Sequence, residues 1–222
     1  MMKKNGFTLI EILVTLAVIG IVAAISIPAL STDSQKKVYA NSLSVAVSNL
    51  ENATTAYLIG ENKYSLYETP AWESYEDNLD HPKAFGKKIK LINKGKASSF
   101  YKDDKNIVPL KKTKNENVNG ISKLGLSNAK TYEAKSGAFY LIDINESIVG
   151  IDVNGLKKPN KVGRDIFMFL LDSDGYLKPY GTNVNGEGIV DTKNCSSKAT
   201  WSEGGGITCA ARLAQNGYKM DY

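Results

Sequence analysis

The feature that most constrains this 222-residue chain is an apolar run close to its start, residues 7–30. Only six of its 24 residues are not plainly apolar: Thr8, Glu11, Thr15, Gly20, Ser26 and Pro28. As a helix that rises about 1.5 Å per residue, the run covers the roughly 30 Å hydrocarbon core of a bilayer. Lys3 and Lys4 precede it, so the positive-inside rule places the N-terminus in the cytoplasm and the rest of the chain outside.

Glu11 is a carboxylate inside this apolar run, where a charge is unfavourable and is usually retained because it has a partner. One alternative is a discarded secretory signal, cut at a small-residue site near Ala29. Two facts argue against this alternative: it gives Glu11 no role, and the apolar run is longer than the core of a typical secretory signal. A cut between Gly6 and Phe7 instead exposes a positive α-amine one helical turn from Glu11. Each charge can then pair with its opposite on a neighbouring copy, so the glutamate would set the stagger between subunits.

The stretch KKNGFTLIEILVTLAVIGIVAAISIPAL resembles the N-terminal signal of type IV pilins and of the pseudopilins of type II secretion. The resemblance implies that prepilin peptidase removes a leader, residues 1–6, after Gly6 and then N-methylates Phe7. It also implies that Glu11 is the assembly glutamate and that Pro28 kinks or loosens the helix. Residues 7–30 would form the transmembrane helix and, later, the core of a filament.

The same resemblance implies partners and a location. The partners would be other pilin subunits, prepilin peptidase and the assembly platform of the bacterial inner membrane. The chain would first be a single-pass protein of that membrane, with its body outside. It would then join a pilus or pseudopilus filament at the cell surface or in the periplasm.

Beyond residue 30 the pattern predicts a body in which the same helix continues to about residue 60. An apolar stripe recurs at three- and four-residue spacing, which is typical of a helix that packs on a core. Its members are Ala40, Leu43, Val47, Leu50, Thr54 and Tyr57. Gly60 is a candidate C-terminal stop. In pilin-like proteins such a helix packs on a sheet.

The clearest strand signals lie at about 137–180. Two runs, 138–142 and 147–151, predict a hairpin, 165–171 a third strand, and DSDG at 172–175 a tight turn into YLKPYG. KKIKLINKGK, residues 87–96, suggests a short exposed strand. The expected fold class is therefore α+β and pilin-like: a long N-terminal helix, transmembrane and then amphipathic, packed on three or four antiparallel strands. Residues 31–222 would form the globular domain.

The chain has two cysteines, Cys195 and Cys209, which together with the membrane segment suggest one disulfide outside the cytoplasm. Closing a loop of this size contributes about 3 kcal/mol in the chain-entropy model. A zinc site is disfavoured because the single histidine, His81, is far away in sequence. In type IV pilins a C-terminal disulfide loop, here 195–209, locks the end of the chain to the sheet. By that resemblance Trp201 is either a contact residue for partners or packs against its own loop.

The segment IDVNGLKKPNKVGRDIF is dense in aspartate, asparagine and glycine, which indicates either backbone turns or oxygen ligands for calcium. Asp152, Asn154 and Asp165 are the weak calcium candidates. The segment departs from the spacing of an EF-hand and resembles a connection between strands in prepilin-type proteins, so the turn interpretation is favoured. DSDG is interpreted as a turn for the same reason.

Residues 83–135 contain 14 lysines and four acidic residues, a local charge of +10. The simpler interpretation is a solvated lysine-rich face. The alternative is a surface for an acidic partner such as DNA or an anionic cell surface. Catalysis finds no support, because the sequence has no nucleophile motif, phosphate loop or dinucleotide fingerprint. The chain is expected to be no enzyme and to need no cofactor.

Three functions therefore compete. The first is a structural subunit of a type IV pilus or pilus-like filament, with a pseudopilin of type II secretion as the alternative. The resemblance implies that major pseudopilins carry a calcium site and lack a disulfide, so Cys195 and Cys209 favour a pilin. The second is a DNA-binding or adhesive minor pilin that uses the lysine-rich region. The third is a monomeric membrane-anchored protein for which Glu11 is dispensable.

Overall fold

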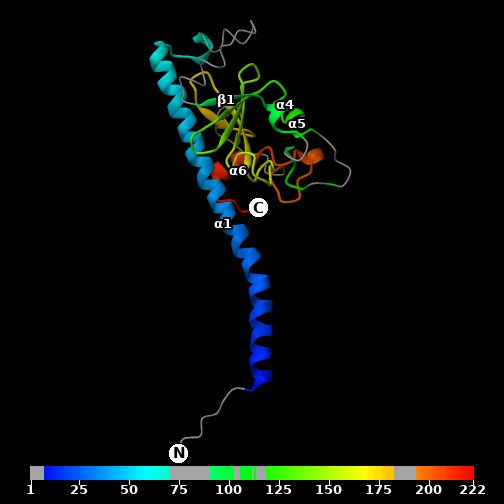
Figure 1. The fold of residues 1–222 in the computed structure, drawn as a ribbon. Coiled ribbons are helices and arrows are strands. Elements are labelled where there is room, and N and C mark those ends of the chain that lie inside the picture. The colour runs from blue at the N-terminus through cyan, green and yellow to red at the C-terminus, as the bar shows by residue number, and fades with distance from the viewer. Residues whose placement is uncertain (1–7, 71–90, 103–105, 112, 114–118, 183–193) are drawn as a thin grey trace, which may run out of the picture. The chain divides into compact units, whose positions relative to one another are not determined.

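The fold was derived from a computed structural model, which describes all residues except 1–7, 71–90, 103–105, 112, 114–118 and 183–193 (Figure 1). Of residues 25–31 it describes the backbone only. The chain divides into two compact units, Met1–Val38 and Tyr39–Tyr222. The described part of the first unit is helical, and the second unit holds the sheet. The predicted leader 1–6 and His81 lie outside the described residues.

Helix α1, Leu9–Glu61, includes the predicted amphipathic stretch. All six residues of the predicted stripe are buried in the second unit. The helix ends one residue beyond the predicted stop at Gly60. Asn62 takes a left-handed φ of 55°, and the N–H of Lys63 donates to the carbonyl of Leu58 at 3.0 Å. Asparagine is one of the residues that can adopt this conformation and so end a helix.

In the described part of the chain the sheet has six antiparallel strands, and neighbours in sequence are neighbours in space. They are β1 Ile92–Lys96, β2 Lys130–Glu133, β3 Phe139–Asp143, β4 Ile148–Asp152, β5 Ile166–Leu171 and β6 Leu177–Pro179. The predicted hairpin corresponds to β3 and β4, the predicted third strand to β5, and the short strand suggested in 87–96 to β1. The expectation of three or four strands starting at about 137 was wrong, because the sheet begins at Ile92 and includes β2.

Short helices complete the second unit. They are η1 Leu66–Glu68, α4 Ala97–Phe100, α5 Gly120–Lys123, η4 Trp201–Glu203 and α6 Cys209–Gln215. From Tyr39 onward, α1 lies along one face of the sheet, whereas α4 and α5 lie on the other side (Figure 1). Tyr140 and Ile142 of β3 face the α1 cluster, and Phe139 and Leu141 face the opposite cluster. Both faces of the sheet are therefore buried.

The β5–β6 turn is docked onto α1. The carboxylate of Asp172 accepts the N–H groups of Asp174 and Tyr176, which closes the predicted DSDG turn. Gly175 has a φ of +86°, and a Cβ added there would lie 2.9 Å from Oγ1 of Thr54. That hydroxyl donates to the carbonyl of Gly175 at 2.7 Å. Glycine is needed here both for the left-handed φ and for the close approach to the helix.

Candidate functional site

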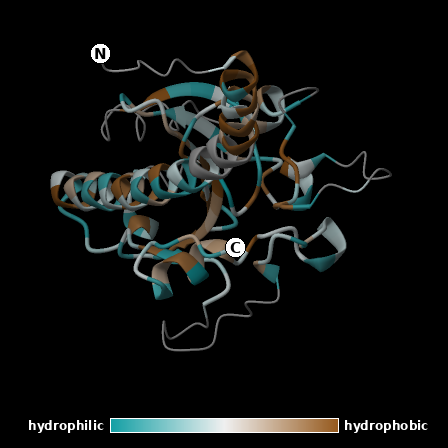
Figure 2. Cartoon of the chain, turned by 90° about the horizontal axis from the view of Figure 1, so that it is seen from below, coloured by the Kyte–Doolittle hydropathy of each residue, from teal (hydrophilic) through white to brown (hydrophobic). Residues whose placement is uncertain are grey.

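The first turns of α1 expose apolar side chains all round. Every large apolar residue from Leu9 to Val22 is exposed, from 47% at Ile12 to 77% at Leu9. Figure 2 shows these turns as predominantly hydrophobic, whereas the later turns of the helix alternate between hydrophilic and hydrophobic residues. A helix that is apolar on every side is stable when other helices or lipid cover it. These turns are therefore a candidate surface for assembly.

Among the residues that the structure describes, no helix is long and apolar enough to cross a membrane. The prediction that residues 7–30 form a transmembrane helix is accordingly not confirmed.

Glu11 is held at the N-terminus of α1 by Thr8. Its Oε2 atom accepts the backbone N–H of Thr8 at 2.7 Å and the hydroxyl of Thr8 at 2.8 Å. In return, the N–H of Glu11 donates to Oγ1 of Thr8 at 3.3 Å. This is a capping box, in which an N-cap threonine and a glutamate three residues later satisfy each other's helix-end donors. The role of Thr8 was not among the predictions, although the spacing T-x-x-E indicates it.

The arrangement places one carboxylate at the apolar N-terminal end of the helix in a defined position. A carboxylate held in this position can form an ion pair with a positive group of a neighbouring chain without first having to reorient. The cleavage and methylation residues Gly6 and Phe7 lie outside the described residues. Pro28 lies within the backbone of α1, and the predicted kink there stays a prediction.

The predicted disulfide is present: Cys195 and Cys209 are bonded, and neither is exposed to solvent. It ties the segment before η4 to the first residue of α6. Trp201 is half-buried and packs against its own loop, because a Cβ on Gly205 would lie 2.7 Å from the Trp201 ring. The structure thus favours the second interpretation of Trp201, as a packing residue.

Asp152 and Asp165 bracket the loop between β4 and β5, and both are completely buried. Asp152 accepts the Tyr101 hydroxyl at 2.8 Å and the N–H of Asn154 at 3.1 Å. Asp165 accepts the N–H groups of Asn160 at 2.9 Å and of Lys161 at 2.6 Å. These contacts support the turn interpretation, because the candidate calcium ligands shape the backbone of the loop. Among the described residues, no group of three or more His, Cys, Asp or Glu side chains could hold a metal ion.

Burial raises the pKa of Asp165 to about 6. The pKa of Asp152 is raised well above its usual value, first by burial and then by the negative charge of Asp165. Burial likewise raises the pKa of Tyr101 well above its ordinary value, so its hydroxyl stays a donor to Asp152 at neutral pH. The pair therefore belongs to the folded interior of the body and not to an exposed catalytic site.

The lysine-rich region is only partly within the described residues. Lys94 is paired with Glu133 at 2.7 Å, which fits a solvated face. Lys96 and Lys130, by contrast, lie directly opposite each other in the β1–β2 pair. Two like charges in this position destabilise a sheet. An acidic partner for this region stays a prediction.

Residues 1–27 match the family model of the prokaryotic N-terminal methylation motif. The chain carries the N-terminal signal of type IV pilins and pseudopilins. The match includes Gly6, Phe7 and Glu11 and ends just before Pro28. The motif implies processing by prepilin peptidase and assembly with other pilin subunits.

No curated protein and no solved structure matches the chain. The α+β class of the body is thus observed, with its helix and antiparallel sheet, whereas its likeness to pilins is not confirmed by a structural neighbour.

Proposed function

We propose that this chain is a structural subunit of a type IV pilus or pilus-like filament. Prepilin peptidase removes residues 1–6 and methylates Phe7. The processed chain waits in the bacterial inner membrane as a single-pass protein and then enters the filament through the helix at 7–30. The body, 31–222, faces outward. The chain is not an enzyme in this account and binds no cofactor.

The proposal rests on the combination of the matched signal with the exposed apolar surface of the helix that begins within it. The motif spans residues 1–27, and the described turns of that helix expose apolar side chains on all sides. An apolar surface of this kind is unfavourable for a single chain in water, whereas lipid and the helices of other subunits would both cover it. The capping box of Thr8 supports the role of Glu11, because it keeps the carboxylate at the end of the helix that would meet a neighbour's Phe7 amine.

A pseudopilin of type II secretion is the alternative within the same family of signals. The buried disulfide between Cys195 and Cys209 favours the pilin, given the resemblance stated above. A pseudopilin would show the same processing at Gly6 and Phe7, so only the place of assembly separates the two.

The assembly role of Glu11 is tested with the variants Glu11→Ala and Glu11→Gln. Both remove the charge that would pair with the Phe7 amine of a neighbouring subunit, so we expect normal removal of residues 1–6 but at least a tenfold smaller yield of sheared filaments, a factor equivalent to about 1.4 kcal/mol. Asp33→Asn is the matched control, because Asp33 is an exposed acidic residue of the same helix outside 7–30. Wild-type filament yield from Glu11→Gln would show that the charge of Glu11 does not set the stagger, whereas an absence of this chain from filaments of the unmodified strain would favour a monomeric anchored protein.

A second candidate, a DNA-binding or adhesive minor pilin, rests on the opposed lysines Lys96 and Lys130. An anionic partner between them would relieve their repulsion. We expect binding to double-stranded DNA that falls steeply with salt and weakens in the variant with both lysines changed to glutamine. An absence of binding at low salt would rule out this candidate for DNA.

A further inference from the structure

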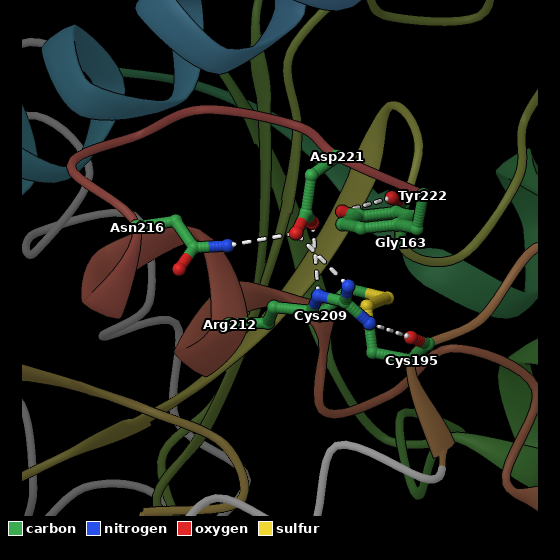
Figure 3. A network of polar contacts seen from close by, with 7 residues as sticks. All are labelled: Gly163, Cys195, Cys209, Arg212, Asn216, Asp221 and Tyr222. Atoms are coloured by element: carbon green, nitrogen blue, oxygen red, sulfur yellow. Dashed lines mark hydrogen bonds and ion pairs between the residues drawn. A yellow bond between two sulfur atoms is a disulfide. The ribbon is translucent and has the colours of Figure 1, made fainter.

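The end of the chain returns to the buried disulfide. Cys209 is the first residue of α6, and Arg212 lies three residues further along that helix, close to one turn away. Figure 3 shows the side chain of Arg212 between the disulfide and the last two residues, Asp221 and Tyr222. Three parts of the chain therefore meet at one guanidinium group: the segment of Cys195, helix α6 and the C-terminal tail.

Arg212 donates a hydrogen bond from each of its three guanidinium nitrogens. Its terminal NH1 group donates to the carbonyl oxygen of Cys195 at 2.8 Å. Its Nε and NH2 groups donate to the two carboxylate oxygens of Asp221, both at 2.9 Å. Bidentate pairs of this kind are stronger and more directional than single hydrogen bonds. One side chain thus fixes the tail to the backbone of a disulfide cysteine.

The tail is anchored at two further points. Nδ2 of Asn216 donates to Asp221 at 3.1 Å, and the guanidinium carbon of Arg212 lies 5.4 Å from the centre of the Tyr222 ring. The Tyr222 hydroxyl donates to the carbonyl of Gly163 at 2.6 Å (Figure 3). The last of these contacts joins the tail to the β4–β5 loop, which contains Gly163.

Gly163 itself lies against the disulfide. A Cβ added to Gly163 would stand 2.6 Å from the sulfur of Cys209. The tail therefore ends on the residue that covers one side of the sulfur, while Arg212 holds the other cysteine. Both cysteines have an exposed fraction of 0% in this arrangement.

The ionisation states of the tail suit a fixed structure at neutral pH. Hydrogen bonds from Arg212 lower the pKa of Asp221, so that carboxylate stays charged. Burial raises the pKa of Tyr222, so its hydroxyl stays protonated and can donate to Gly163.

We propose that Arg212, Asp221 and Tyr222 form a C-terminal clasp that controls thiol–disulfide exchange at Cys195–Cys209. Exchange requires a thiolate to attack one sulfur of the bond, and the other sulfur leaves as a thiolate. With reduced glutathione, the first attack gives a mixed disulfide and one protein thiol. A second glutathione displaces the protein sulfur, so two glutathione molecules are oxidised and two protein thiols form. The closed clasp excludes the first glutathione and, after reduction, keeps the two cysteines together for re-oxidation.

The test measures the rate at which excess reduced glutathione opens the disulfide of the full-length chain in detergent, by trapping the new thiols and counting them by mass. Arg212→Lys keeps the positive charge but cannot bridge Asp221 and Cys195 with a fork. We expect opening at least about tenfold faster, a factor equivalent to about 1.4 kcal/mol. Deletion of residues 221–222 should give the same result, and Lys219→Ala, an exposed residue of the same tail, should leave the rate unchanged.

A general loss of stability is separated from an open clasp by the dependence of the rate on urea. Opening of the clasp exposes little surface, so the rate in the variants should hardly change at low urea concentrations, whereas global unfolding accelerates steeply. Tyr222→Phe loses one hydrogen bond and keeps the ring, so it folds and should still open several-fold faster. Wild-type rates in Arg212→Lys and in the truncated chain would overturn the proposal, as would rates that simply follow global unfolding.

Discussion

At the scale of single residues, the body contains two buried carboxyl groups, Asp152 and Asp165, whose ionisation is unfavourable in the folded state. Each is completely buried, and each accepts hydrogen bonds from neighbours that shape the β4–β5 loop. Burial raises the pKa of both groups, to about 6 for Asp165 and well above its usual value for Asp152. A carboxyl group with a raised pKa in the folded state binds its proton more tightly there than in the unfolded chain. It stabilises the fold at low pH, and that contribution is lost as pH rises.

We therefore predict that the free energy of unfolding falls between about pH 4 and pH 6, by about 3 kcal/mol on the scale of Asp165, and that Asp152 adds to this fall as pH rises. In Asp152→Asn the decline should be smaller, because only Asp165, with a pKa of about 6, still contributes to it. Urea unfolding across this range is the measurement. Tyr101→Phe keeps both carboxyl groups and should retain the decline. A wild-type stability that rises steadily from pH 4 to pH 7 would contradict the assigned burial.

A second residue-scale prediction concerns Gly163, which combines a left-handed φ of +79° with close contact to Cys209. Gly137 has a similar φ of +85° but nothing within 4 Å of an added Cβ. Alanine at either position pays the conformational penalty of about 1–2 kcal/mol. Gly163→Ala should be destabilised by about 1–3 kcal/mol more, because its methyl group overpacks the disulfide. Equal shifts of the urea midpoint in the two variants would show that the contact with the sulfur is not tight.

At the scale of elements, α1 has two surfaces of different character. From Tyr39 onward one stripe is buried on the sheet, and its spacing of three and four residues made it predictable from the sequence. Leu43 in this stripe is completely buried, whereas Val45, two residues away, is 57% exposed. Helix α1 is thus bound to the body by a stripe and not by its whole circumference.

Leu43→Ala should lower the free energy of unfolding by about 2–5 kcal/mol, because it leaves a cavity between α1 and the sheet. Val45→Ala, on the exposed side, should change it by no more than about 0.5 kcal/mol. Urea unfolding of the detergent-solubilised chain measures both. Similar effects for the two substitutions would mean that α1 is not packed on the sheet by this stripe.

The strands show where sequence patterns succeed and where they fail. The hairpin of β3 and β4 and the strand β5 were predictable because their apolar runs are continuous and bounded by turn residues. The core on the face of the sheet opposite α1 was not predictable. Runs such as FYLID are apolar without alternation, so the sequence does not show whether one face of the strand or both faces are buried. β2, Lys130–Glu133, was missed because it has only four residues and three of them are polar. β1 gave a weak signal, since an edge strand with Lys94 and a bulge near Gly95 is a poor strand by composition.

The two ends of the chain show the same contrast. Thr8 and Glu11 interact locally, so the spacing T-x-x-E contains the information for their capping box. The contacts of Arg212 with Cys195 and of Tyr222 with Gly163 join residues 17 and 59 positions apart. Their geometry depends on the folded sheet and the disulfide, so no local pattern could have predicted them.

At the scale of the whole molecule, the matched motif at 1–27 and the exposed apolar turns within it indicate a chain that assembles with other pilin subunits. The compact body with its closed C-terminal end would face outward, where an oxidising environment preserves the disulfide. The proposed function therefore requires that the chain enters a filament after processing at Gly6 and Phe7.

The most direct test is to shear filaments from cells that express the chain and to identify its N-terminal peptide by mass spectrometry, with the membrane fraction as the control. The account predicts an N-methylated peptide that begins at Phe7 in the sheared fraction. The same peptide confined to the membrane fraction would contradict surface assembly and favour a pseudopilin. A mature end near Ser31 in either fraction would contradict the account as a whole, because residues 7–30 would then be a discarded signal.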